Sequence, residues 1–268
     1  MLTTESLAAE FENVRSQLKS FVLRMTASVE ETEDLVQDTY LKAHEKLGTF
    51  RGESSLKTWL FSIATNLTKD YLRSRKLWPE TVTDICRNAA LTNSRFLGNM
   101  MKVRTTSPHG NFEISEHITF CFTCIGKSLP VEQQVTLLLK EVYEFKVSEI
   151  ALIMEKTEAM VKYYLHTARS KMIDIFENRC ALINKEGPCH QCSELNGIFN
   201  PRQKIQEEAM KIEMCREADG KDKERLFDLR MKIVKAIDPF NSAASDLQLL
   251  HLQHNRRVMD DYLKKDQE

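Results

Sequence analysis

Two stretches in the first third of the chain carry apolar residues at helical spacing. One apolar stripe runs along a predicted helix at Leu56, Trp59, Leu60, Ile63, Leu67 and Tyr71. Upstream, a helix with acidic first turns has a second stripe, at Leu35, Thr39, Ala43 and Leu47. Ser28 and Glu31 have the spacing of a capping box, which marks the expected start of this acidic helix. The pattern predicts a helical hairpin in which an acidic helix precedes a more basic one.

The middle of the chain has the pattern of a helix-turn-helix. Leu129-Pro130 precedes one amphipathic helix, and residues 147–154 form a second, shorter one. In a third helix, beginning after the expected N-cap Thr157, one face should be buried: Val161, Leu165, Ala168 and Met172. The turn before Thr157 needs a left-handed backbone, and Glu155 costs about 1 kcal/mol there relative to glycine.

The remaining segments add helices and a linker. Periodicity fades from residue 77 to 115, where Trp78-Pro79, Thr, Ser, Asn and Gly predict an irregular tether. Helical patterns return in residues 203–218, 222–237 and 243–265. With only eight glycines and six prolines in 268 residues, the composition argues against a β-rich chain. We therefore expect an all-α protein of two or three small domains.

Charge limits the classes of nucleic-acid binder to which the chain can belong. The formal net charge is -1, so the protein is not a polycation that coats nucleic acid. Between Lys42 and Lys76, however, eight Lys or Arg residues stand against three Asp or Glu residues. DNA affinity should therefore be local. No apolar run approaches about 18 residues and no signal-peptide pattern opens the chain, so we expect a cytoplasmic protein without a membrane anchor.

Five ordered segments of the first hairpin resemble the second conserved region of an extracytoplasmic-function (group IV) RNA polymerase sigma factor. These segments are Asp34–Ala43, Phe50–Gly52, Thr58–Leu60, Ile63–Asn66 and Tyr71–Arg73. The helix-turn-helix resembles the fourth region of the same family, and the resemblance covers roughly residues 10–76 and 113–178. It implies a sigma region 2 helical bundle and a sigma region 4 helix-turn-helix, both DNA-binding, joined by a linker. The domains expected are residues 1–76 (region 2), 77–112 (linker), 113–179 (region 4) and 180–268 (a cysteine-containing loop and helical carboxy-terminal extension).

The resemblance assigns roles to three groups of residues. The acidic helix would bind core RNA polymerase through Asp34, Gln37, Asp38 and Lys42. The loop and basic helix would bind and melt the minus-ten element through Phe50, Arg51, Ser54, Ser55, Lys57, Trp59, Asn66, Lys69, Arg73 and Lys76. The last helix of the helix-turn-helix would bind the minus-thirty-five element through Thr157, Glu158, Ala159, Lys162, Tyr163, His166 and Arg169. Partners would be core polymerase, promoter DNA and, as a candidate, an anti-sigma factor.

The chemistry of these residues suits the implied roles. A flipped base needs a small pocket with polar edges, and the loop from Phe50 to Ser55 offers hydroxyls, a carboxylate and backbone amides beside an aromatic ring. In the major groove Glu158 can accept a hydrogen bond from a cytosine amine, while Lys162 or Arg169 holds phosphates. No phosphate loop, helical H-E-x-x-H or glycine-flanked serine is present, so catalysis is expected to belong to the partner.

Two other functions fit part of the same pattern. One is a helix-turn-helix regulator that binds duplex DNA without polymerase. The other is a zinc- or thiol-sensing interaction protein in which the DNA surfaces are vestigial. Polymerase-dependent transcription, tight duplex binding by the protein alone, and stoichiometric zinc or reversible thiol oxidation distinguish the three.

The seven cysteines are an odd number, which argues against a disulfide framework in a reducing compartment. Cys121 and Cys124 lie in an apolar stretch and are expected to be small core residues. Cys189 and Cys192 follow a Gly-Pro turn, where a zinc knuckle, a redox pair and a structural turn all stay open. A sigma factor is expected to need no cofactor, but zinc at Cys189 and Cys192 is a candidate. The candidate ligands are Cys180, Cys189, His190 and Cys192, with Cys215 as a more distant alternative.

The helical tail has two interpretations. It can be a stabilising cap, or it can mask a binding surface and act as an intramolecular anti-sigma at a tethered concentration in the millimolar range. Under the second interpretation, loss of residues 203–268 raises promoter activity.

Overall fold

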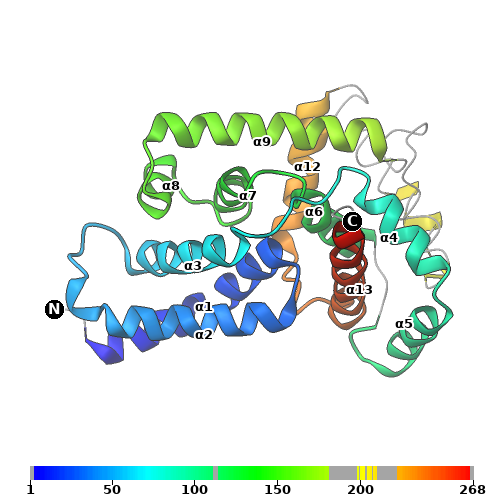
Figure 1. Cartoon of the computed structure of the whole chain (residues 1–268), viewed down its shortest axis with the longest axis horizontal. Helices are drawn as coiled ribbons and strands as arrows, with labels where there is room; N and C mark the ends of the chain where they lie inside the picture. Colours follow the sequence, from blue (N-terminus) through cyan, green and yellow to red (C-terminus); the bar gives the residue numbers. More distant parts are fainter. Residues whose placement is uncertain are drawn as a thin grey trace. The chain divides into compact units, whose positions relative to one another are not determined.

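A computed structural model of the chain describes residues 3–110, 114–180, 198, 200–202, 204–206, 208–209 and 222–265. All regular elements in these ranges are helices, which confirms the all-α prediction (Figure 1). No helix in the described ranges combines the length and hydrophobicity that a membrane crossing requires. The chain forms two compact units. Unit 1 contains Met1–Lys76 and Pro130–Ala168, and unit 2 contains Leu77–Leu129 and Arg169–Glu268.

Unit 1 begins with three helices that pack against one another: α1 (Thr4–Thr26), α2 (Val29–Glu45) and α3 (Leu56–Leu72), with the 3-10 turn η1 (Leu47–Thr49) before the loop that leads to α3. The Ser28 hydroxyl accepts a hydrogen bond from the Glu31 amide at 3.4 Å and caps α2, so the predicted start of the acidic helix is confirmed. The Ser55 hydroxyl caps α3 by accepting from the Thr58 amide at 3.0 Å.

Helix α3 is buried on more faces than its apolar stripe predicts. Leu60 and Ile63 of the stripe are buried, but so are Phe61 and Ala64 on another face. The reason is that α8 (Val147–Met154) also packs against α3 in unit 1. A stripe drawn from one helix and its hairpin partner does not anticipate a second partner far along the chain.

An aromatic cluster joins α3 to the segment before α8. The Phe61 ring lies 5.6 Å from Phe21 and Tyr143 and 4.9 Å from Phe145, measured between centroids. The Tyr143 hydroxyl donates to Ser20 Oγ at 3.0 Å. Tilted and edge-on aromatic contacts of this kind add to the stabilisation that burial alone provides. The cluster therefore fixes the helix-turn-helix segment on α3.

The helix-turn-helix consists of α7 (Val131–Leu137), which continues into the π-helical turn η2 (Leu138–Val142), then α8 and α9 (Glu158–Arg179). Glu155 has a φ of 54°, which confirms the predicted left-handed turn. The Thr157 hydroxyl accepts from the Met160 amide at 3.3 Å, which confirms the predicted N-cap of α9. Val161, Ala168 and Met172 are fully buried, as the pattern predicts, whereas Leu165 is half-buried.

Unit 2 contains two helices where an irregular tether was expected, α4 (Val82–Leu91) and α5 (Ser94–Thr106). They form because an apolar residue recurs every four positions in α4, at Val82, Cys86 and Ala90, and because the Asn93 side chain caps α5. Contact with α13 (Ser245–Lys265) buries their apolar faces, which the local sequence cannot indicate.

The other helices of unit 2 are α6 (Ile114–Gly126) and α12 (Lys223–Ala236), which pack against each other. The predicted helices at 222–237 and 243–265 are confirmed, whereas that at 203–218 lies largely outside the described residues. Cys121 and Cys124 on α6 are buried, as expected of small core residues. The four-part domain division expected from the sequence stays a prediction.

Candidate nucleic-acid interface

The outer face of α2 carries the residues expected to bind polymerase. Asp34, Gln37, Asp38 and Lys42 are all exposed, and their spacing places them on one side of the helix. The opposite side, with Leu35 and Val36, is buried. Leu41 is 49% exposed on the polar face and was not among the predicted residues, although an apolar residue at that position of the pattern could have drawn attention to it. The exposed face of α2 is therefore acidic and includes the apolar side chain of Leu41.

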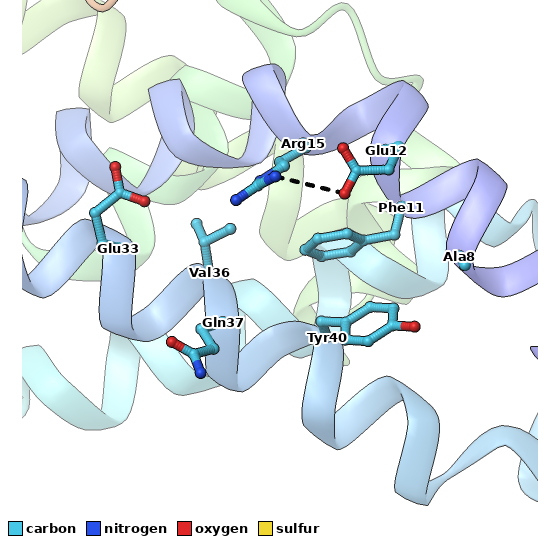
Figure 2. A pocket seen from close by; sticks show the side chains of 8 residues that line it. All are labelled: Ala8, Phe11, Glu12, Arg15, Glu33, Val36, Gln37 and Tyr40. Atoms are coloured by element: carbon cyan, nitrogen blue, oxygen red, sulfur yellow. Dashed lines mark ion pairs between the residues drawn. The ribbon is translucent and has the colours of Figure 1, made fainter.

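A groove of about 300 Å³ lies beside this face, between α1 and α2 (Figure 2). Its lining residues are Ala8, Phe11, Glu12, Arg15, Glu33, Val36, Gln37 and Tyr40. The Phe11 and Tyr40 rings form its apolar end, with centroids 4.9 Å apart, and Arg15 pairs with Glu12 at 3.5 Å. Of these lining residues, only Gln37 was among the residues predicted to bind polymerase. The others were missed because the groove forms only when α1 and α2 pack together, which the pattern of either helix alone does not show.

The loop before α3 and the outer side of α3 hold the residues expected at the minus-ten element. Exposed members are Arg51, Ser55, Asn66, Arg73 and Lys76, and half-buried members are Phe50, Ser54, Lys57, Trp59 and Lys69. The Phe50 and Trp59 rings lie 5.1 Å apart, so the loop is held against the first turn of α3. Trp59, Asn66 and Arg73 repeat every seven residues and share a side of the helix.

Several of these side chains have partners within unit 1. The Ser55 hydroxyl is used as the N-cap of α3, and Arg73 pairs with Asp70 at 2.6 Å. The Lys57 ammonium lies 5.1 Å from the centre of the Phe145 ring, and Lys69 pairs with Glu132 at 3.8 Å. The last two partners belong to the helix-turn-helix segment, and no local pattern predicted them.

The amino-terminal half of α9 presents the residues expected at the minus-thirty-five element. Thr157, Glu158, Ala159, Lys162, Tyr163 and His166 are exposed, and Tyr163 keeps 62% of its surface. Arg169 differs, because its side chain is only 22% exposed and pairs with Glu224 and Asp228 of α12 at 3.0 and 2.9 Å. Met160, 40% exposed beside these residues, was not predicted.

The candidate zinc ligands Cys189, His190 and Cys192, and the alternative Cys215, lie outside the described residues. Cys180 is half-buried, and its sulfur accepts from the Arg230 guanidinium at 3.6 Å. Among the residues that the structure describes, no group of three or more His, Cys, Asp and Glu could hold a metal ion. Zinc at Cys189 and Cys192 stays a prediction.

Several titratable groups are buried in unit 2. Burial lowers the pKa of His117 to about 4 and holds the pKa of His251 well below its usual range. Burial also raises the pKa of the Cys124 thiol to about 12, partly offset by the hydrogen bond that Asn255 Nδ2 donates to it at 3.7 Å. His117, His251 and the Cys124 thiol are therefore neutral near pH 7.

Comparison with known proteins matches both modules. Residues 11–77 match the model of Sigma-70 region 2, and residues 121–172 match that of Sigma-70, region 4. The ECF RNA polymerase sigma-E factor of Escherichia coli (strain K12) is 30% identical over 155 residues, which cover 58% of this chain and 73% of the relative. The chain belongs to the ECF RNA polymerase sigma factor family.

Two further sigma factors extend the comparison. RNA polymerase sigma factor YlaC of Bacillus subtilis (strain 168) is 26% identical over 174 residues, covering 63% of this chain and 90% of the relative. ECF RNA polymerase sigma factor SigG of Mycobacterium tuberculosis (strain ATCC 25618 / H37Rv) is 30% identical over 179 residues, covering 62% of this chain. The match spans about half of SigG, 47% of its length.

The two family matches contain the candidate binding surfaces of this ECF sigma factor, and two of its helices lie outside them. The region 2 match contains the exposed face of α2 and the loop with α3, and the region 4 match contains the exposed side of α9. Helices α12 and α13 lie beyond both matches. The contact of α12 with Arg169 therefore joins an additional helix to a residue of the region 4 module.

Proposed function

We propose that this ECF sigma factor binds core RNA polymerase and directs promoter-specific initiation of transcription. The observation that carries the proposal is the two-sided character of α2: its apolar side is buried in the bundle, while Asp34, Gln37, Asp38 and Lys42 stay exposed on the other. An exposed, charged face of this kind suits a charged partner surface. Leu41 and the groove lined by Phe11 and Tyr40 add apolar area for that partner.

The loop and α3 are proposed to bind the non-template strand of the minus-ten element. Arg51, Asn66, Arg73 and Lys76 are exposed and can contact phosphates, and the Phe50 and Trp59 rings offer a stacking surface for an unstacked base. Lys57 and Lys69 would exchange Phe145 and Glu132 for phosphates as the strand binds. Melting would thus be coupled to a rearrangement of contacts on α3.

Helix α9 is proposed to lie in the major groove at the minus-thirty-five element. Its amino-terminal turn presents Glu158 for a cytosine amine and Ala159 for a thymine methyl group. Lys162, His166 and Arg169 follow at helical spacing on one side and suit the phosphate backbone. Base contacts would set the promoter sequence, and phosphate contacts would set the register.

The protein would act in the cytoplasm, because core polymerase and promoter DNA are located there. The chain's own residues bind and position, and the polymerase supplies catalysis. An anti-sigma factor and zinc at Cys189 and Cys192 stay predictions.

The test is in vitro transcription by purified core polymerase from a library of randomised promoters. The intact protein is compared with Asp34→Ala/Asp38→Ala, which removes two exposed charges from α2. The matched control is Glu208→Ala/Asp261→Ala, which removes two exposed charges beyond both family matches. A third variant, Lys162→Ala, addresses the minus-thirty-five contact.

The intact protein and the control should enrich promoters with two separated elements. Asp34→Ala/Asp38→Ala should lower transcript yield at least about tenfold without changing the enriched sequences, because truncating charged contacts at an interface typically costs more than about 1.4 kcal/mol. Lys162→Ala should weaken all promoters alike. Absence of protein-dependent transcripts from the intact protein would refute the proposal, and tight duplex binding without polymerase would point to a free-standing regulator.

A further inference from the structure

Three residues of α12 surround the side chain of Arg169 on α9. Glu224, Phe227 and Asp228 lie three and four residues apart and therefore share a side of α12. Both carboxylates accept from the same Arg169 nitrogen, Nη2, at 3.0 and 2.9 Å. The Phe227 ring lies beneath the guanidinium, 4.9 Å from its carbon to the ring centre. The guanidinium is thus bound by two anions and an aromatic ring.

The remainder of α12 is attached to α9 by contacts that do not involve Arg169. The Arg230 guanidinium lies 3.6 Å from the centre of the Phe176 ring, and Lys223 pairs with Glu177. Phe227 and Arg230 are 2% exposed. Because these contacts are independent of the two carboxylates, the charges of Glu224 and Asp228 can be removed while α12 keeps its anchors.

The position of Arg169 gives the contact its meaning. Lys162, His166 and Arg169 follow one another along the side of α9 that the proposed function directs at DNA phosphates. Lys162 and His166 are exposed, whereas the Arg169 side chain is 22% exposed. Two carboxylate oxygens on one guanidinium reproduce the anionic oxygens that a phosphate would present. The same guanidinium nitrogen cannot serve the carboxylates and a phosphate together.

We propose that Glu224 and Asp228 of α12 mimic a DNA phosphate and compete with duplex DNA for Arg169. This inference rests on the proposed function of α9 and identifies the residues through which the tail would act on it. Duplex binding would exchange two carboxylates for a phosphate at Arg169 and leave the Arg230–Phe176 and Lys223–Glu177 contacts of α12 in place. The tail would then lower duplex affinity by competition between charges and would not need to unfold.

The test measures binding of the intact protein to a fluorescent random-sequence DNA duplex at low salt, by anisotropy. Random duplex carries the same phosphates as a promoter, so the assay depends on neither the promoter sequence nor the polymerase. The variants are Glu224→Gln/Asp228→Asn, Arg169→Ala, and the combination of all three substitutions. Asp261→Asn, an exposed carboxylate of α13, is the control for a general change in net charge. Thermal unfolding of every variant checks that unit 2 stays folded.

Glu224→Gln/Asp228→Asn should bind duplex about three- to tenfold more tightly than the intact protein, since two partly exposed ion pairs no longer compete. Arg169→Ala should cancel this gain in the combined variant, Asp261→Asn should gain less than twofold, and added salt should shrink the difference. Equal affinity of the charge-removed variant and the intact protein, a gain that survives Arg169→Ala, or no binding by any variant would each overturn the inference. Failure of the proposed function appears separately, as missing transcripts in the polymerase assay.

Discussion

Removal of the Phe61 ring is expected to destabilise unit 1 strongly. Phe61 is fully buried, and its ring is surrounded by Phe21, Tyr143 and Phe145 at centroid distances of 4.9 to 5.6 Å. Phe61→Ala would leave a cavity that none of these rings can fill without breaking its own contacts. Because two of the three rings come from the helix-turn-helix segment, the substitution also weakens the attachment of that segment to α3.

The magnitude follows from the cavity and from the lost ring contacts. Phe→Ala substitutions in cores cost about 3–5 kcal/mol, and with its three ring contacts Phe61 should lose at least the middle value, about 4 kcal/mol. Typical domains unfold with a free energy of about 5–15 kcal/mol, so the loss is a large fraction of the total. Phe61→Leu keeps most of the apolar volume and should cost about 1–1.5 kcal/mol. Phe50→Ala, a half-buried ring with Trp59 as its ring contact, should cost at most about 1.5 kcal/mol.

Urea unfolding followed by tryptophan fluorescence can report unit 1 by itself. The chain has two tryptophans, Trp59 in unit 1 and Trp78 in unit 2, so a Trp78→Phe background leaves Trp59 as the reporter. Each variant is measured in this background. A loss below about 2 kcal/mol for Phe61→Ala, or one no larger than that of Phe61→Leu, would refute the assignment of Phe61 to the centre of a packed cluster.

Three further predictions concern separate parts of the chain. Glu155→Gly should raise the unfolding free energy by about 0.5–1 kcal/mol in urea, because glycine relieves the left-handed backbone at φ 54°; a destabilised variant would contradict this. Burial lowers the pKa of His117 from 6.5 to about 4, so the unfolded state takes up a proton at a higher pH than the folded state does. About 3 kcal/mol of unit 2 stability should therefore be lost as the pH falls from about 6.5 to 4. His117→Leu should make this dependence on pH shallower, as measured by urea unfolding with Trp78 as reporter. A profile that is equally steep without His117 would exclude it as the cause. Burial raises the pKa values of the Cys86 and Cys124 thiols, so in the native protein both should be alkylated more than about tenfold more slowly than in urea. Peptide mass spectrometry follows the alkylation of each thiol. Rapid labelling of the native protein would show that the thiols are accessible.

The sequence determined the local features of this protein. Helical periodicity fixed the existence of α2, α3 and α9, and side-chain hydrogen bonding placed the caps at Ser28 and Thr157. The polar pattern also selected the residues that prove to be exposed on α2 and on the first half of α9. These predictions succeeded because period, capping and exposure depend on residues within a few positions of one another.

Only the tertiary structure decided which faces meet. Helices α4 and α5 were expected to be an irregular tether, and contact with α13, more than a hundred residues away, buries their apolar faces. Phe145 and Glu132 meet Lys57 and Lys69, and Glu224 meets Arg169 across 55 positions of sequence. A helical pattern indicates that a face will be buried or exposed but carries no information about its partner, because the partner is chosen by complementary shape and charge brought together when the whole chain folds.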